Sequence, residues 1–278
     1  KIKNFNSISY NNTDLNNLTD LIVDKNIKFC FHFAAKVEVK QAETLPFQTF
    51  ENNNMLTLKL LEAFRISKNL KSFIYTSTDK VYGDIDINHL PYKENYTPKA
   101  INPYEVSKLN CENMCKSYSH LYKLPIVITR SCNLYGPGQL NFSAIIPSLI
   151  MSVLNNTRFL PRSNGLLTRD YMFIEDWAEC LIKISQKNFL KKYKAEVFNF
   201  GTNNPKNVIE IARIISSMID KKNKNIVLSD FSKIKSKNEI IDQTLNSDKA
   251  IKEFSKFNKT DLNSGIKKTI NWYKKYLN

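Results

Sequence analysis

The chain has 278 residues, of which 42% are hydrophobic and 24% are charged. This composition is typical of a globular protein with one large or two modest domains, and it excludes a low-complexity chain. The longest apolar run, residues 144–153, is interrupted by polar and proline positions, so no membrane partner is expected. The N-terminus lacks an apolar signal core, which favours a cytoplasmic protein.

The formal net charge of +15 raises the question of nucleic-acid binding. Such binding requires basic residues gathered on one face, with aromatic or groove-reading elements beside them. The lysines are instead spread from Lys25 to Lys275, so no nucleic-acid partner is expected. A positive field still helps to attract an anionic diphosphate substrate.

The five cysteines are scattered and show neither a zinc-site spacing nor a disulfide framework. Cys111 and Cys115 lie one helical turn apart, which alone is too few ligands for a metal ion. We therefore expect reduced, mostly buried thiols and no metal.

Apolar segments and helical patterns alternate along the chain, which favours an α/β fold. Residues 27–35 form a near-continuous apolar run that ends in small residues, as expected for a parallel strand buried on both faces. The residues between 84 and 99 are polar and contain prolines, so they are expected to form a loop over the site. The expected strands are 5–9, 27–35, 72–75, 123–130, 196–200 and 225–228, and the expected helices are 14–24, 47–67, one from Pro103, 175–187, 207–219 and 262–277.

Tyr104 and Lys108 are four residues apart, just inside the helix that is expected to begin at Pro103. They therefore share one helix face. A phenol with an ordinary pKa of about 10 is a poor base at neutral pH unless a nearby cation such as Lys108 favours its phenolate. The same spacing is common on ordinary amphipathic helices, so the pair alone does not establish a catalytic site.

Residues 76–83 supply a second motif, a polar strand end and turn that contains Thr78. With the Tyr104/Lys108 pair, this segment resembles the extended short-chain dehydrogenase/reductase family, whose members act on nucleotide sugars with tightly held NAD. Within that family the chain is most similar to the CDP-glucose 4,6-dehydratase-like members. The resemblance continues through residues 31–35, Asn53 with Thr57, 60–63, 130–136, 165–171, 198–201 and 265–273.

The resemblance implies a Rossmann-type doubly wound parallel sheet, with an NAD-binding domain at residues 1–133. Residues 134–278 would form mainly a smaller α/β substrate-binding domain, with segments that cross back. No glycine precedes Gly83, so the glycine loop of the N-terminal βαβ unit is expected to be missing. A truncated product, a part supplied by another chain, and a protein that has lost its cofactor are the three interpretations.

The resemblance also implies roles for individual residues. The catalytic residues would be Thr78, Asp79, Lys80, Tyr104 and Lys108. NAD would contact Ala34, Ala35, Lys36, Asn53, Ser77, Tyr104, Lys108 and Cys132, and the substrate would contact Asn133, Asn141, Arg162 and Arg169. Close packing of the alanines and surface ion pairing of the arginines are the alternative explanations.

Asp79 and Lys80 favour one reaction within the family. The resemblance implies that 4,6-dehydratases carry an aspartate followed by glutamate or lysine at these positions, whereas 4-epimerases carry small or inert residues. We therefore expect an NAD-dependent nucleotide-sugar 4,6-dehydratase, with a 4-epimerase or a cofactor-free remnant as alternatives. The resemblance further implies a homodimer formed through the Tyr104-bearing helix and the preceding helix.

Overall fold

The computed structural model describes residues 14–84, 87–159, 161, 163–186, 195–219, 231, 242–255 and 257–277. Three expectations lie outside these residues: the strands at 5–9 and 225–228, and the position of Arg162.

A four-stranded parallel sheet forms the centre of the molecule, in the order β1-β2-β3-β7. Ser72 pairs with Phe29 on one side, and Thr78 pairs with Ser131 on the other, so β2 is enclosed by neighbours along most of its length. The expected parallel α/β sheet is therefore confirmed. Its strands are β1 (Phe29–His32), β2 (Ser72–Thr78), β3 (Ile126–Ser131) and β7 (Glu196–Phe200).

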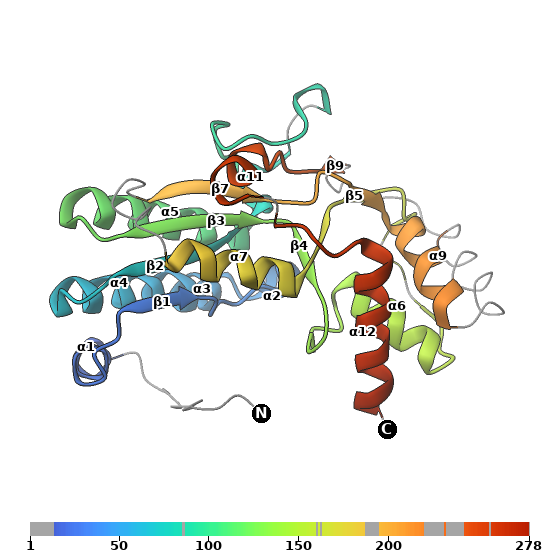
Figure 1. Ribbon diagram of the computed structural model, residues 1–278, viewed down its shortest axis with the longest axis horizontal. Helices are drawn as coiled ribbons and strands as arrows, with labels where there is room; N and C mark the ends of the chain where they lie inside the picture. The colour runs from blue at the N-terminus through green and yellow to red at the C-terminus, as the bar shows by residue number, and fades with distance from the viewer. Residues whose placement is uncertain are drawn as a thin grey trace.

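Helices cover both faces of this sheet, as Figure 1 shows. Side chains alternate between the faces along β2: Phe73 and Tyr75 pack in one cluster, whereas Ile74 packs in the other. The Phe73 cluster includes residues of α1 (Leu15–Asp24), α4 (Leu56–Ser67) and α5 (Pro103–Tyr122). The Ile74 cluster includes residues of α7 (Ile174–Gln186) and α11 (Asp248–Phe254). The doubly wound, Rossmann-type arrangement is thus confirmed.

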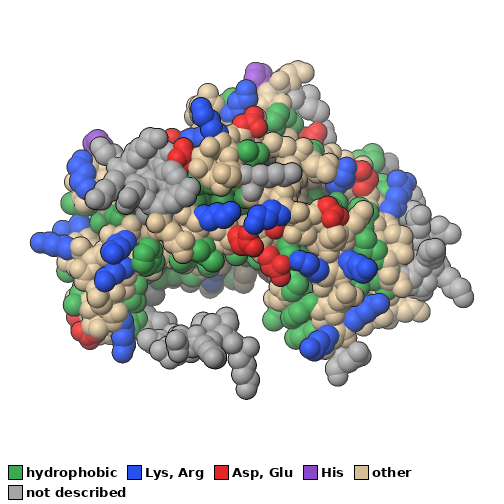
Figure 2. Space-filling model, in the orientation of Figure 1, with side chains coloured by type: hydrophobic (Ala, Val, Ile, Leu, Met, Phe, Trp, Pro, Cys, Tyr) green, Lys and Arg blue, Asp and Glu red, His purple; other side chains and the backbone are tan. Residues whose placement is uncertain are grey.

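A second part of the molecule has its own apolar core. Its helices are α6 (Ile145–Leu154), α9 (Val208–Ile219) and α12 (Leu262–Leu277). Its strands are the parallel pair β4 (Asn133–Tyr135) and β6 (Tyr171–Phe173), and the sheet β8-β5-β9, formed by Lys206–Asn207, Thr168–Arg169 and Asp242–Gln243. Figure 2 shows the surface hollowed between this part and the sheet that carries β1.

The chain passes between the two parts more than once. β7, α7 and α11 come from the second half of the sequence but complete the central sheet and one of its helical layers. The division at residue 133 stays a prediction, and it describes sequence order better than position in space.

Local sequence explains where the site-bearing helices begin and bend. α5 begins with a capping box, in which the Asn102 side chain and Glu105 satisfy free backbone N–H groups, and Pro103 occupies the first helical position. The helix expected at 47–67 is interrupted: α3 (Pro46–Phe50) continues through a π-helical turn, Glu51–Met55, into α4. Such turns often lie at functional sites. A short helix, α2 (Val39–Thr44), precedes them.

Candidate active site

The candidate catalytic residues meet at the carboxyl end of β2. Thr78 is the last residue of this strand, and Asp79 and Lys80 begin the 3₁₀ turn Asp79–Tyr82 that follows it. The first turns of α5 bring Tyr104 and Lys108 to the same place, because α5 packs against both β2 and this turn. The carboxyl ends of parallel strands are where ligands bind in open α/β sheets.

Thr78, Asp79 and Tyr104 form a buried polar group. The Thr78 hydroxyl donates a hydrogen bond to Asp79 Oδ1 at 3.1 Å and accepts one from the Lys80 backbone N–H at 3.3 Å. Burial raises the pKa of the Tyr104 phenol, the interaction with the Thr78 side chain lowers it, and the nearby Asp79 carboxylate raises it further. The three side chains therefore lie together at the end of β2.

Asp79 has an unusual environment for a carboxylate. It is only 2% exposed, and its Oδ2 has no hydrogen-bond partner among the described residues. A buried polar atom without a partner costs free energy, and such atoms are rare in folded proteins. The oxygen therefore keeps an unused hydrogen-bond acceptor position at the end of β2.

Lys108 is buried beside the strand and not on the helix surface. Its Nζ donates a 2.6 Å hydrogen bond to the Thr76 carbonyl and lies 5.0 Å from the centre of the Tyr75 ring. Burial lowers the pKa of Lys108 to about 8. We expected this ammonium to favour the Tyr104 phenolate, but burial dominates and the pKa of Tyr104 is raised. The structure thus supports a shared location for the pair and not the expected shift.

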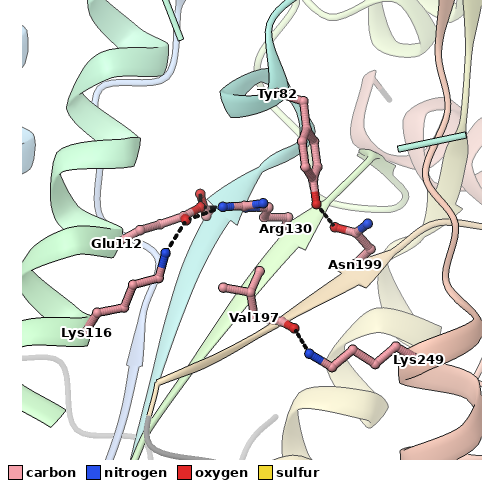
Figure 3. A network of polar contacts seen from close by, with 8 residues as sticks. Tyr82, Glu112, Lys116, Arg130, Val197, Asn199 and Lys249 are labelled. Carbon is pink, nitrogen blue, oxygen red and sulfur yellow. Dashed lines mark hydrogen bonds and ion pairs between the residues drawn. The ribbon is translucent and has the colours of Figure 1, made fainter. Parts of the chain in front are cut away.

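Beneath the site, Glu112 and Arg130 form an ion pair that no sequence motif predicted. Arg130 Nε and Nη2 donate to the two Glu112 oxygens at 2.9 and 2.6 Å, and both side chains are almost fully buried. Ser77 donates to the same carboxylate at 2.6 Å. Figure 3 shows Arg130 lying between Glu112 and the Tyr82 ring. The guanidinium carbon of Arg130 is 4.6 Å from the centre of that ring. An arginine within an otherwise uncharged strand was the available sequence signal.

Three of the four predicted substrate residues, all but Arg162, are among the described residues and lie on the second part of the molecule. Asn133 begins β4 and Arg169 ends β5, and both are half-buried. Asn141 accepts hydrogen bonds from the backbone and the hydroxyl of Ser143, so its side-chain oxygen shapes the turn before α6. Cys132 is buried, and burial raises the pKa of its thiol. The contacts given above for these residues do not show which ligand they bind.

Metal ligands, cysteines and apolar helices were compared within the described part of the chain. It contains no group of three or more His, Cys, Asp or Glu residues that could hold a metal ion. All five cysteines are free thiols. No helix in this part is long and apolar enough to cross a membrane.

Comparison with known proteins identifies the family. The model of the NAD dependent epimerase/dehydratase family matches residues 2–201. The chain belongs to this family. A trifunctional UDP-glucose 4,6-dehydratase/UDP-4-keto-6-deoxy-D-glucose 3,5-epimerase/UDP-4-keto-L-rhamnose-reductase of Arabidopsis thaliana is 30% identical over 259 residues, 91% of this chain but only 37% of that protein. The human dTDP-D-glucose 4,6-dehydratase is 30% identical over 262 residues, 91% of this chain and 71% of that one.

A solved structure supports the fold. The UDP-glucose 4-epimerase of Thermotoga maritima, determined with UDP-glucose, superimposes with a TM-score of 0.86 over 100% of this chain and 88% of its own. At 24% identity this likeness concerns the architecture alone. The family is NAD-dependent, so the residues at the strand ends can be tested for their fit to that cofactor.

The end of β1 fits a dinucleotide. Ala34 and Ala35 lie just beyond this strand, after Phe33, and their methyl side chains permit the close approach of a ligand. The buried Asn53, in the π-helical turn, holds the Lys36 backbone: its Oδ1 accepts from the Lys36 N–H at 2.7 Å and its Nδ2 donates to the Lys36 carbonyl at 3.1 Å. Asn53 also donates to Ser107 of α5 at 2.9 Å. One amide thus fixes the loop after β1 relative to the helix of Tyr104 and Lys108.

Proposed function

We propose that the chain carries the catalytic site of an NAD-dependent nucleotide-sugar 4,6-dehydratase. The observation that supports this proposal best is the Asp79 carboxylate, buried beside Thr78 with one oxygen unpartnered among the described residues and with Lys80 next to it in the chain. A 4-epimerase of the same family needs the tyrosine and the threonine but has no use for a second acid and base at the sugar's C5 and C6.

Residues at the ends of β1 and β2 would hold the cofactor. Tyr104 and Lys108 would face its ribose, and the loop of Ala34, Ala35 and Lys36, fixed by Asn53, would lie along it, with Ser77 and Cys132 nearby. NAD, when bound, supplies a hydride acceptor for C4 of the sugar and a hydride donor for C6. Every other step falls to the side chains of this chain.

The proposed reaction begins at the sugar 4-hydroxyl. Burial keeps the Tyr104 phenol neutral in the unliganded chain, so Tyr104 must first give up its own proton. Its phenolate then takes the proton of the 4-hydroxyl, and the Thr78 hydroxyl binds the same oxygen, as C4 becomes a ketone. The ketone makes the adjacent C5 proton acidic. Lys80, as the uncharged amine, then removes that proton while Asp79, as the protonated acid, donates one to the departing 6-hydroxyl, so that water leaves and a C5=C6 double bond forms. Hydride at C6 and the returning proton at C5 give a 4-keto-6-deoxy sugar, and no net oxidant is consumed.

The second part of the molecule would bind the nucleotide diphosphate. An arginine guanidinium suits phosphate because its planar fork gives two parallel hydrogen bonds, so Arg169 is the proposed contact among the described residues, with Arg162 and the amides of Asn133 and Asn141 as further candidates. Asp79 followed by Lys80 resembles the CDP-glucose type, whereas the two relatives named above act on UDP-glucose and dTDP-glucose by name. The nucleotide is therefore left to experiment.

The test separates oxidation at C4 from loss of water. The full-length protein is offered CDP-, dTDP-, UDP- and GDP-linked glucose with NAD, and the 4-keto-6-deoxy product and the reduced cofactor are followed. In Asp79→Asn we expect reduced cofactor to accumulate while product formation falls about 10²- to 10⁴-fold, because the acid for the 6-hydroxyl is missing. Tyr104→Phe should lose both signals.

The matched control is Asp84→Asn, which changes an exposed aspartate just after the turn Asp79–Tyr82 and should behave as the wild type. A 4-epimer as the only product, or an Asp79→Asn variant with unchanged turnover, would overturn the dehydratase proposal.

A further inference from the structure

A contact between Lys80 and Gln243 joins two residues that lie far apart in the sequence. Lys80 Nζ donates a hydrogen bond to Gln243 Oε1 at 3.2 Å. Gln243 is only 2% exposed, although glutamine is mostly a surface residue. Its side chain therefore occupies the interior and makes this contact with a residue of the proposed catalytic group. No motif or spacing in the sequence marks this glutamine.

The backbone holds Gln243 firmly in place. Gln243 ends β9, where it pairs in parallel register with Arg169 of β5. The next residue, Thr244, accepts a 2.8 Å hydrogen bond from the Tyr92 N–H, and Asn246 donates one to the Tyr92 carbonyl at 2.9 Å. Tyr92 thereby fastens the segment after β9 to the loop that follows Gly83.

The same tyrosine also fixes the turn that carries Lys80. The Tyr92 ring stacks on Tyr82, with centroids 4.8 Å apart and an interplanar angle of 7°, and its hydroxyl donates to the Gly83 carbonyl at 2.8 Å. Tyr82 belongs to the 3₁₀ turn of Lys80. The backbones on both sides of the Lys80–Gln243 contact are thus part of one packed unit.

We propose that Gln243 is a positioning residue that holds the Lys80 amine in line with C5 of the substrate sugar. This inference rests on the dehydratase function proposed above. A lysine side chain has four rotatable bonds, so fixing it in one conformation costs conformational entropy. The contact with the buried Gln243 orders the Lys80 side chain before the substrate binds. The amide oxygen accepts one N–H of Lys80. Once the ammonium has lost a proton, the nitrogen lone pair is left free to accept the C5 proton.

A neutral acceptor suits this task better than a carboxylate. A carboxylate in the same place would stabilise the ammonium form electrostatically and so oppose the loss of a proton that a base requires. Glutamine provides direction without that added charge. We infer that Gln243 acts on the elimination step and leaves oxidation at C4 to Tyr104 and Thr78.

The test is a double-mutant cycle on the full-length protein. Gln243→Leu, Lys80→Met and the double variant are compared by two rates: solvent deuterium entering C5, and reduction of the cofactor. Gln243→Leu should slow entry of deuterium about 10- to 100-fold, the size of effect that a misplaced catalytic group produces, and change cofactor reduction less than about twofold. In the Lys80→Met background, Gln243→Leu should cause no further loss of exchange, because it acts through Lys80.

Gln41→Leu, an exposed glutamine on α2, is the control and should leave both rates unchanged. A second cycle on melting temperature needs no turnover: the losses for Lys80→Met and Gln243→Leu should not add in the double variant, because they remove one shared contact.

Three outcomes would count against the inference. Unchanged deuterium exchange in Gln243→Leu, with normal 4-keto product from the wild type, would overturn it and leave the dehydratase proposal standing. Equal slowing of both rates, or additive melting-temperature losses, would show a general structural role and overturn it in the same way. A wild-type protein that makes only a 4-epimer would overturn the dehydratase proposal and the inference together.

Discussion

Burial decides the protonation of the residues that line the ends of β1 and β2. It raises the pKa of Tyr104 and lowers that of Lys108, so it favours the neutral form of both members of the pair. His32, at the end of β1, follows the same rule: burial, with a smaller effect of the Lys108 charge, lowers its pKa to about 3. Spacing in the sequence predicted which side chains share a face, but their charge depends on the packing around them.

His32 gives a prediction of how stability depends on pH. Its Nε2 lies 2.9 Å from the Thr57 hydroxyl, which itself donates to the Asn53 carbonyl, so Nε2 is the donor of this bond. Burial keeps the ring neutral. The unfolded chain takes up a proton below about pH 6.5, whereas the folded chain does not until about pH 3. The unfolded state then binds more protons, so stability must fall as the pH drops through this window. Between pH 7 and pH 5 we expect a loss of about 2 kcal/mol from this group.

Urea unfolding of the wild type, His32→Asn and His120→Asn at both pH values would measure the effect. His32→Asn should lose about 2 kcal/mol less than the wild type over this interval, whereas His120→Asn, which changes an exposed histidine, should follow the wild type. Parallel curves for all three proteins would show that His32 is not held neutral.

At the scale of secondary structure, the Glu112–Arg130 pair fixes α5 against the sheet. Glu112 comes from the helix of Tyr104 and Lys108, Arg130 from β3, and Ser77, which bonds the same carboxylate, from β2. The pair thereby links the three elements whose relative position sets the site. Removing one partner of a buried pair leaves the other charge unpaired and usually costs about 3–5 kcal/mol.

Glu112→Gln is the variant that tests this link. It keeps the side-chain shape but leaves Arg130 without a counter-charge, so the free energy of unfolding should fall by about 3–5 kcal/mol. Glu62→Gln breaks the more exposed Glu62–Arg65 pair of α4 and should cost no more than about 1 kcal/mol. Urea unfolding of both variants gives the comparison. Equal small losses would mean that the buried pair does not hold α5 in place.

Helices and strands that are determined by residues close to them in the sequence could be predicted from local pattern. The start of α5 follows from Asn102, Pro103 and Glu105, and the strand at 196–200 and the helices at 175–187, 207–219 and 262–277 lie where they were expected, to within a residue. The π-helical turn at Glu51–Met55 was not anticipated, because Asn53 is held there by Lys36 and Ser107, which belong to other segments.

The candidate site follows the same division. Thr78, Asp79, Tyr104 and Lys108 come together as motif and spacing indicated, since each sits at the end of an element that the sequence defines. Gln243 could not be found in this way. Its place depends on pairing with β5 and on Tyr92, which lies about 150 residues earlier in the chain. Contacts between residues so distant in sequence leave no periodic signal.

At the scale of the whole molecule, α4 and α5 present a surface that could join two copies of the chain. The two helices pack side by side on one face of the sheet, where the Tyr118 hydroxyl donates to Glu62 and the Arg65 guanidinium lies 5.2 Å from the Tyr122 ring. Ile66, Leu121 and Tyr122 are largely exposed there. Exposed apolar side chains rimmed by charged ones are typical of interaction sites. We therefore keep the homodimer through these helices as a prediction.

Leu121→Lys should weaken that dimer. Leu121 is 62% exposed in the single chain, and burying a lysine ammonium in its place at a helix–helix interface would cost several kcal/mol, so we expect the dissociation constant to rise at least about tenfold. Ile182→Lys is the matched control, because Ile182 is 50% exposed but lies on α7, in the opposite helical layer. Sedimentation velocity at several protein concentrations would follow the change. A dimer that Leu121→Lys leaves intact and Ile182→Lys dissociates would move the interface to the other face of the sheet, and a monomeric wild type would exclude the dimer altogether.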